Sequence, residues 1–171
     1  MTSSLRVAPS RPAQDNGSDE RSILRTWLRM LTCTNIIEGR VRAALRETFD
    51  TTLPRFDLLA SLDAATLEAP QGLTMSELSR RLMVTNGNLT GLVDRLVREG
   101  LVARVASRPD RRAQMISLTA TGKLALDAIA PEHATWVSGM FSGLTNTDRQ
   151  QLYSLLGKLK QSAKAAAEHS R

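Results

Sequence analysis

The chain has 171 residues, of which 42% are hydrophobic and only 4% aromatic, and its formal net charge is +6. This length suffices for one domain with its own core, and the scarcity of aromatic residues favours helices packed on helices. The single cysteine, Cys33, excludes an internal disulfide, and no apolar run reaches the length of about 18 residues that a membrane span needs.

The N-terminal part of the chain divides into a tail and a long helix. Residues 1–19 combine Pro, Ser, Gly and Asn with little apolar periodicity, so we predict a disordered tail there. Apolar residues then recur at helical spacing from about residue 20 to residue 50 and cover more than one face of the helix. Such a helix is typical of a dimer interface, and we expect Leu24 and Leu28 to contribute to it.

The middle of the chain predicts a helix-turn-helix. Pro54 opens a helix that runs to about residue 67, and Thr74 with Glu77 forms a capping-box pattern before a short helix. Another short helix, with one apolar stripe, extends over 86–99 and ends at Gly100, which suits a left-handed backbone. Two short helices joined by a tight turn are the pattern of this motif.

The remaining elements are a hairpin and further helices. Residues 101–105 and 115–118 are short and apolar enough to pair as strands. The helix that begins near Thr119 contains Pro131, which should kink it or restart it. A capping signal over 144–148 precedes an amphipathic terminal helix. Either intramolecular or intermolecular packing explains its apolar stripe; we favour a dimer contact through Leu152, Leu155, Leu156 and Leu159.

Positive charge is concentrated in residues 74–123, which hold nine Lys/Arg and four Asp/Glu. Phosphate contacts require such a concentration. The polar face of the helix over 86–99 offers Asn, Thr and Arg side chains, which can contact adenine, thymine or guanine in a major groove. Gly87 and Gly91 leave room for close approach to a duplex. A solvated helix face with incidental glycines is the alternative.

The tip of the hairpin adds to this prediction. Arg108, Arg111 and Arg112 project there beside Pro109 and Asp110, on a ribbon that fits a minor groove about 6 Å wide. A loop that only improves solubility is the alternative. For the helix-turn-helix and the tip together, we predict DNA contacts from Ser76, Thr85, Asn86, Asn88, Thr90, Gly91, Arg95, Arg98, Arg108, Asp110, Arg111 and Arg112.

The segment from Met75 to Gly122 resembles the winged helix-turn-helix of the multiple-antibiotic-resistance regulator (MarR) family. The wing pattern of that family, Asp-x-Arg followed by a strand and Leu-Thr-x-x-Gly, is matched by Asp110, Arg112, Leu118, Thr119 and Gly122. The resemblance covers about residues 20–165. It implies a mainly α winged helix-turn-helix fold with a small β-hairpin.

This resemblance also implies an organisation and a function. One domain would extend over 20–168, with dimerisation helices in 20–50 and 120–168 around a DNA-reading lobe in 54–119. The homodimer would bind a near-palindromic operator in double-stranded DNA, with half-sites about one helical turn, or roughly 34–36 Å, apart. Family members of this kind usually repress transcription in the cytoplasm and are released by a small molecule.

An effector site is implied between the dimer helices and the DNA-reading lobe. Apolar walls with a few cations suit an aromatic acid or its coenzyme A thioester, and the first helix resembles that of members controlling aromatic-acid breakdown. Ordinary core packing and surface charge are the alternative. The predicted ligand contacts are Trp27, Met30, Arg40, Arg42, Phe49, Phe56, Trp136 and Met140.

Enzyme chemistry is not indicated by any motif. The sequence has no Gly-rich phosphate loop, nucleophile elbow or His/Cys/carboxylate cluster, so we expect no catalysis, cofactor or metal. We expect Cys33 to be a buried structural thiol, with an oxidation sensor as the alternative, and His133 to be a surface residue. A non-specific architectural DNA binder is the main competing function. A second competing function is a protein-interaction dimer that no longer binds DNA. The presence of Asp110, Arg111 and Arg112 argues against this second function.

Overall fold

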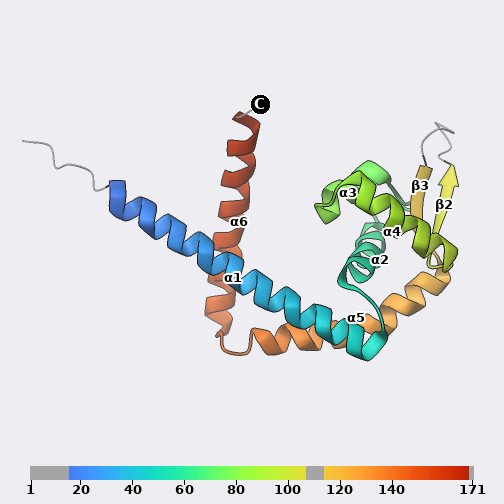
Figure 1. The fold of residues 1–171 in the computed structure, drawn as a ribbon, viewed down its shortest axis with the longest axis horizontal. Helices are drawn as coiled ribbons and strands as arrows, with labels where there is room; N and C mark the ends of the chain where they lie inside the picture. Colours follow the sequence, from blue (N-terminus) through green and yellow to red (C-terminus); the bar gives the residue numbers. More distant parts are fainter. Residues whose placement is uncertain (1–15, 107–113, 170–171) are drawn as a thin grey trace, which may run out of the picture. The chain divides into compact units, whose positions relative to one another are not determined.

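The computed structural model describes residues 16–106 and 114–169. Its elements in chain order are α1 (Asn16–Phe49), α2 (Leu53–Ala65), β1 (Leu73–Thr74), α3 (Met75–Leu82), α4 (Asn86–Arg98), β2 (Val102–Ala106), β3 (Gln114–Leu118), α5 (Ala120–Met140) and α6 (Asn146–His169) (Figure 1). The predicted mainly α fold with a small hairpin is confirmed, and the predicted order of elements holds apart from β1.

The helix α1 begins earlier than the sequence pattern predicts. Residues 16–19, assigned above to a disordered tail, are helical, and Asp19 lies in the first turn, where a negative charge is favourable. Residues 1–15 lie outside the described part of the chain. The chain divides into two compact units, an N-terminal unit ending at Glu38 and a C-terminal unit over Gly39–Arg171, so their boundary falls inside α1.

The core of the C-terminal unit is aliphatic. Leu58 of α2 is completely buried, as are Leu78 of α3 and Ile116 of β3. Three α4 residues are also fully buried, which fixes the inner face of that helix: Leu89, Val93 and Leu96. Burying an aliphatic side chain of this size stabilises the fold by about 1.5–3 kcal/mol.

A three-stranded antiparallel sheet of order β1-β3-β2 closes one side of this core. The predicted hairpin is confirmed within a residue or two at each end, and Val102 of β2 lies opposite Leu118 of β3. The strand β1 was not predicted; its Leu73 pairs with Ile116. Gly72 precedes it at φ +98°, where a Cβ would lie 2.2 Å from the carbonyl oxygen of Ile116, so only glycine fits.

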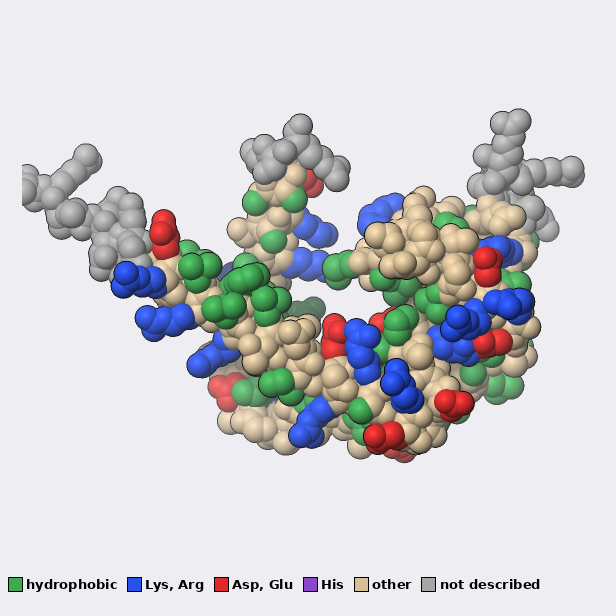
Figure 2. Space-filling view, in the orientation of Figure 1, with side chains coloured by type: hydrophobic (Ala, Val, Ile, Leu, Met, Phe, Trp, Pro, Cys, Tyr) green, Lys and Arg blue, Asp and Glu red, His purple; other side chains and the backbone are tan. Residues whose placement is uncertain are grey.

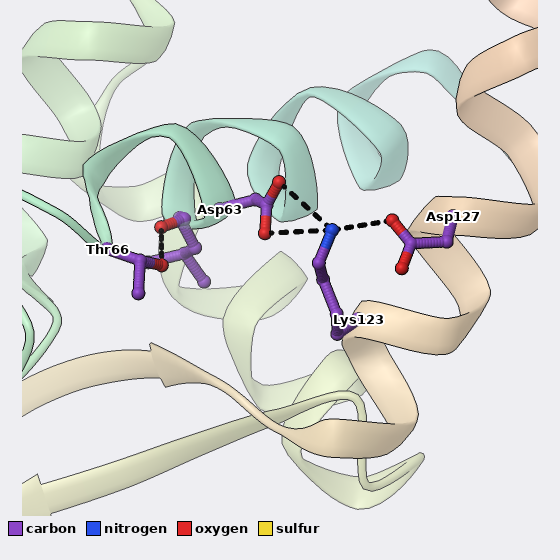
Figure 3. A network of polar contacts seen from close by, with 5 residues as sticks. Asp63, Thr66, Lys123 and Asp127 are labelled. Atoms are coloured by element: carbon purple, nitrogen blue, oxygen red, sulfur yellow. Dashed lines mark hydrogen bonds and ion pairs between the residues drawn. The ribbon is translucent and has the colours of Figure 1, made fainter.

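Polar and aromatic contacts join α2 to α5. The ammonium of Lys123 lies between Asp63 of α2, at 3.3 Å, and Asp127 of its own helix, at 2.5 Å (Figure 3). The hydrogen bond to Asp127 is the main cause of the raised pKa of Lys123. Further along α5 from Lys123 and Asp127, the ring of His133 packs against the ring of Phe56, with ring centroids 4.4 Å apart. These contacts connect α5 to α2, on which α3 and α4 pack.

Helix boundaries follow the capping signals in the sequence. The predicted capping box is present: Glu77 donates its backbone N–H to the Thr74 hydroxyl, and the Thr74 backbone N–H donates to the Glu77 carboxylate. Thr145 and Asp148 make the equivalent pair of bonds before α6. Pro131 lies inside α5, which continues through it as one helix, so of the two predicted alternatives, a kink or a restart, the restart does not occur.

Candidate nucleic-acid interface and ligand cavity

The turn between α3 and α4 is held in a compact form. Met83 ends α3 in the left-handed conformation at φ 53°, and the Ser79 hydroxyl donates to the carbonyl of Val84 at 2.6 Å. Thr85 then occupies the N-cap position of α4, although its side chain makes no capping hydrogen bond. The predicted helix-turn-helix is therefore present, with α4 as the second helix.

The outer face of α4 exposes the side chains that the sequence pattern assigns to base reading. Leu89, Val93 and Leu96 point into the core, so the polar positions between them face outward. A Cβ at Gly87 or Gly91 would meet no atom within 4 Å, so both positions are open. The predicted contacts of this region are all exposed: Ser76, Thr85, Asn86, Asn88, Thr90, Gly91, Arg95 and Arg98.

Hydrogen bonds within α4 determine what this face can offer. The Thr90 hydroxyl donates to the carbonyl of Asn86 at 2.8 Å, which leaves its oxygen and its methyl group available outside. The Arg98 side chain makes a long bond of 3.4 Å to the carbonyl of Asp94. Arg95 makes no hydrogen bond or ion pair with any described residue. Its guanidinium thus has all its donors available for a guanine or a phosphate.

The base of the wing is fixed to α4. Strands β2 and β3 pair from Val102–Leu118 to Ala106–Gln114. Arg104 of β2 forms an ion pair with Asp94 of α4, with Nη2 and Oδ1 2.6 Å apart. The predicted contacts of the tip lie outside the described residues: Arg108, Asp110, Arg111 and Arg112.

Several basic residues of the central segment have acidic partners. Arg104 is paired with Asp94, Arg81 with Glu68 at 3.2 Å, and Lys123 with its two aspartates. On the right of Figure 2, basic side chains accordingly lie next to acidic ones. The positive charge predicted for DNA contact is therefore partly neutralised. Among the described residues, Arg95 and Arg98 on the outer face of α4 form no ion pair with a carboxylate.

A cavity of about 420 Å³ lies between the C-terminal part of α1 and α5. Three of the predicted ligand contacts line it, namely Arg40, Trp136 and Met140. The sequence pattern missed the other lining residues because none is aromatic or basic: Ala43, Ala44, Glu47, Thr135 and Gly139. Such a volume lies in the usual range for small-molecule sites.

The other predicted ligand contacts are placed differently. Phe49 packs against Trp136 with ring centroids 6.2 Å apart, whereas Phe56 is a core residue against His133. Arg42 is exposed and does not line the cavity, and Trp27 and Met30 belong to the N-terminal unit.

Two further expectations are wrong. Cys33 is exposed and not buried, because most of the surrounding α1 residues are themselves uncovered in the single chain. His133 is half-buried and not a surface residue, because Phe56 from another helix covers its ring, and burial lowers the pKa of its imidazole.

Both units expose apolar side chains. In the N-terminal unit, Leu24 is 56% and Leu28 54% exposed, and Trp27 is similarly uncovered. In the C-terminal unit, the stripe on α6 is open to solvent at Leu152, Leu155, Leu156 and Leu159. Within the described ranges there is no group of His, Cys, Asp or Glu that would hold a metal ion. No helix among the same residues is long and apolar enough to cross a bilayer.

Comparison with known proteins agrees with this geometry. Residues 49–113 match the family model described as "MarR family". An uncharacterized HTH-type transcriptional regulator of Bacillus cereus is 32% identical over 134 residues, which are 78% of this chain and 85% of the relative. The transcriptional activatory protein BadR of Rhodopseudomonas palustris is 32% identical over 126 residues, with coverage of 72% and 70%.

Two further similarities concern regulation and DNA. The transcriptional repressor YetL of Bacillus subtilis is 33% identical over 87 residues, which are 51% of this chain and 52% of YetL. The crystal structure of Sco3205 from Streptomyces coelicolor, solved in complex with DNA, superposes with a TM-score of 0.71. It is 23% identical and covers 92% of both chains, so this likeness supports the fold.

Proposed function

Because this chain belongs to the MarR family of helix-turn-helix transcriptional regulators, we propose that it is a homodimeric repressor that releases its operator on binding a small aromatic acid. As a member of that family it is a DNA-binding regulator and not an enzyme. The outer face of α4 is the observation that carries the proposal. Its Asn88, Thr90 and Arg95 are exposed on a helix whose opposite face is completely buried.

Two kinds of DNA contact are proposed for this surface. The side chains near the start of α4 read base edges in the major groove, because recognition helices contact bases with their N-terminal residues. The wing, through Arg108, Asp110, Arg111 and Arg112, adds contacts to the neighbouring minor groove and its phosphates. We place the regulator in the cytoplasm, where it would meet its operator.

A homodimer is supported by the uncovered apolar stripes on α1 and α6. Exposed leucines that recur along a helix over several turns are unfavourable in water, and a second copy of the chain would cover them. We assign dimerisation to residues 20–50 and 120–168, and DNA reading to 54–119. Two-fold symmetry then requires a near-palindromic operator.

The cavity between α1 and α5 supports an effector with an acidic group. Arg40 supplies a cation, while Ala43, Trp136 and Met140 supply apolar walls. Glu47 lies seven residues after Arg40 on the same helix and would repel additional negative charge. An aromatic acid fits this lining better than a coenzyme A thioester, because the polyanionic nucleotide of the thioester would have to lie outside the cavity.

The experiment that tests this function recovers bound duplexes from a random DNA pool. The proposal predicts a near-palindromic sequence that the chain prefers over random DNA at physiological salt. Equal affinity for both would instead identify a non-specific architectural binder. Titration of benzoic and hydroxycinnamic acids against the bound operator then tests release, and transcription from that operator with and without the protein distinguishes a repressor like YetL from an activator like BadR.

A further inference from the structure

An ion pair joins the beginning of α2 to the C-cap residue of α4, which directly follows Arg98 and lies four residues after Arg95. Arg55 donates from Nη1 to Oε1 of Glu99 at 2.7 Å and from Nη2 to Oε2 of the same carboxylate. The contact is bidentate, and the Arg55 side chain is only 21% exposed. Such a fork fixes both the distance and the relative orientation of the two groups.

The position of Glu99 makes this partner necessary. Glu99 is the C-cap residue of α4, where the helix dipole already presents partial negative charge, so a carboxylate there is unfavourable on its own. The hydrogen bonds from Arg55 are the main cause of its lowered pKa, with smaller help from the charges of Arg95 and Arg98. The same pair raises the pKa of Arg55, so both groups are ionised at neutral pH.

A second ion pair acts on the same half of α4. Asp94, five residues before Glu99, is bound to Arg104 of β2. The C-terminal half of the helix is thus tied to α2 by one pair and to the wing by the other. Its N-terminal half, which carries Asn86 and Asn88, has no such tie among the described residues.

The two ion pairs therefore act on the tilt of α4 together with the packing of the buried Leu89, Val93 and Leu96. A helix of 13 residues is about 20 Å long, so a tilt of about 10° at one end moves the other by about 3 Å. Hydrogen bonds to base edges do not tolerate a displacement of that size. Contacts to phosphates by long flexible arginines tolerate it far better.

We propose that Arg55 is a positioning residue for base reading, which acts on DNA only through Glu99 and sets the tilt of the recognition helix. The proposal rests on the sequence-specific reading assigned to α4 above. It predicts that loss of the pair lowers discrimination between operator and random DNA, while the non-specific, phosphate-based affinity is retained.

The Glu99→Gln variant separates this proposal from a simple effect of charge. Removing a negative charge from a DNA-binding surface strengthens binding to all sequences if only charge matters. The positioning role predicts the opposite change: Glu99→Gln should bind the operator more weakly than the wild type does. Arg55→Gln should have the same effect as Glu99→Gln, and the double variant should be no worse than either single variant, because each removes the same contact.

The experiment measures affinities for the selected operator and for a random duplex over a series of salt concentrations, together with the melting temperature of each variant. We expect Arg55→Gln and Glu99→Gln each to lower the operator-to-random ratio by about tenfold, with the salt slope unchanged. Arg81→Gln, which breaks the exposed pair with Glu68, is the matched control and should leave the ratio unchanged.

Two outcomes would overturn the positioning role. An equal loss for both DNAs with a shallower salt slope would make Arg55 a direct phosphate contact. An unchanged ratio in folded variants would make the pair a structural contact only. If Arg55→Gln does not fold, the operator-to-random ratio of Glu99→Gln alone decides between the positioning role and these two outcomes. A wild-type chain with no preference for any DNA would overturn the proposed function as well, whereas a wild-type preference kept by the variants overturns only this inference.

Discussion

The hydroxyl of Thr119 donates to the carbonyl of Gly100 at 2.7 Å and thereby joins the start of α5 to the end of α4. The same oxygen accepts the backbone N–H of Gly122 and caps α5. Thr119 and Gly122 of the wing pattern thus act together: one hydroxyl contacts the residue after the C-cap of α4 and also caps α5. Asp110 and Arg112 of that pattern lie outside the described residues.

Gly122 is required by this close approach. A Cβ at this position would lie 2.0 Å from the carbonyl oxygen of Leu101 and 2.9 Å from the Leu118 side chain. We expect Gly122→Ala to lower the free energy of unfolding by about 1–3 kcal/mol, as in other overpacked sites. Urea unfolding measures this loss, and Gly157→Ala on α6, where a Cβ meets no atom within 4 Å, is the control. Equal stability of Gly122→Ala and the wild type would show that the backbone adjusts freely.

Gly91→Ala should separate stability from DNA binding. The position is exposed within α4 and open to a methyl group, so alanine should stabilise the helix by about 0.5–1 kcal/mol. The same methyl group would face the duplex and weaken operator binding by about tenfold, the cost of one lost base contact. Melting and gel-shift measurements test both effects. Gly157→Ala, off the apolar stripe of α6, should gain stability without losing affinity; undiminished operator binding by Gly91→Ala would place α4 away from the bases.

The helices were predicted well because the residues that mark the ends of a helix lie close together in the sequence. Thr74 with Glu77 and Thr145 with Asp148 are each three residues apart, so a capping box is visible in the sequence. The strand β1 has only two residues and exists because it pairs with β3, more than 40 residues away, so no local pattern indicates it.

The site was predictable only in part for the same reason. The outer face of α4 follows from the spacing of its buried leucines, and the structure exposes every residue assigned to it. The pair of Arg55 with Glu99 spans 44 residues, and the contact of His133 with Phe56 joins two helices, so neither leaves a signal in the spacing of the chain. Glu47 was missed because a carboxylate is not expected beside an acidic ligand.

The capping box predicts a loss of stability in acid. Hydrogen bonds from the backbone and side chain of Thr74 lower the pKa of Glu77 below its usual value. The ionised carboxylate therefore stabilises the fold above the ordinary pKa of glutamate, and this contribution disappears as the pH falls through the lowered pKa. The stability difference between wild type and Glu77→Gln should shrink in that acid range when urea unfolding is followed against pH. In a Thr74→Val background this pH dependence should weaken; a difference independent of pH would contradict the assignment.

Filling the cavity tests the effector site. Gly139 lines it, and a Cβ there would meet no atom within 4 Å, so Gly139→Leu should occupy the space without displacing the backbone. We expect this variant to bind the operator normally but to lose release by aromatic acids, which needs a coupling of only about 1–3 kcal/mol. Gel shifts over an acid titration measure it. Ala134→Leu, exposed on the same helix and outside the cavity lining, should respond like the wild type; release of Gly139→Leu by the same acid concentrations would place the effector elsewhere.

Site-specific photo-crosslinking from position 88 of α4 to the selected operator tests most directly that two copies of this helix read DNA. The account predicts crosslinks to bases in the major groove at two symmetry-related positions, about one helical turn or roughly 34–36 Å apart. Crosslinks at only one position of a bound operator, or none to bases at all, would contradict it.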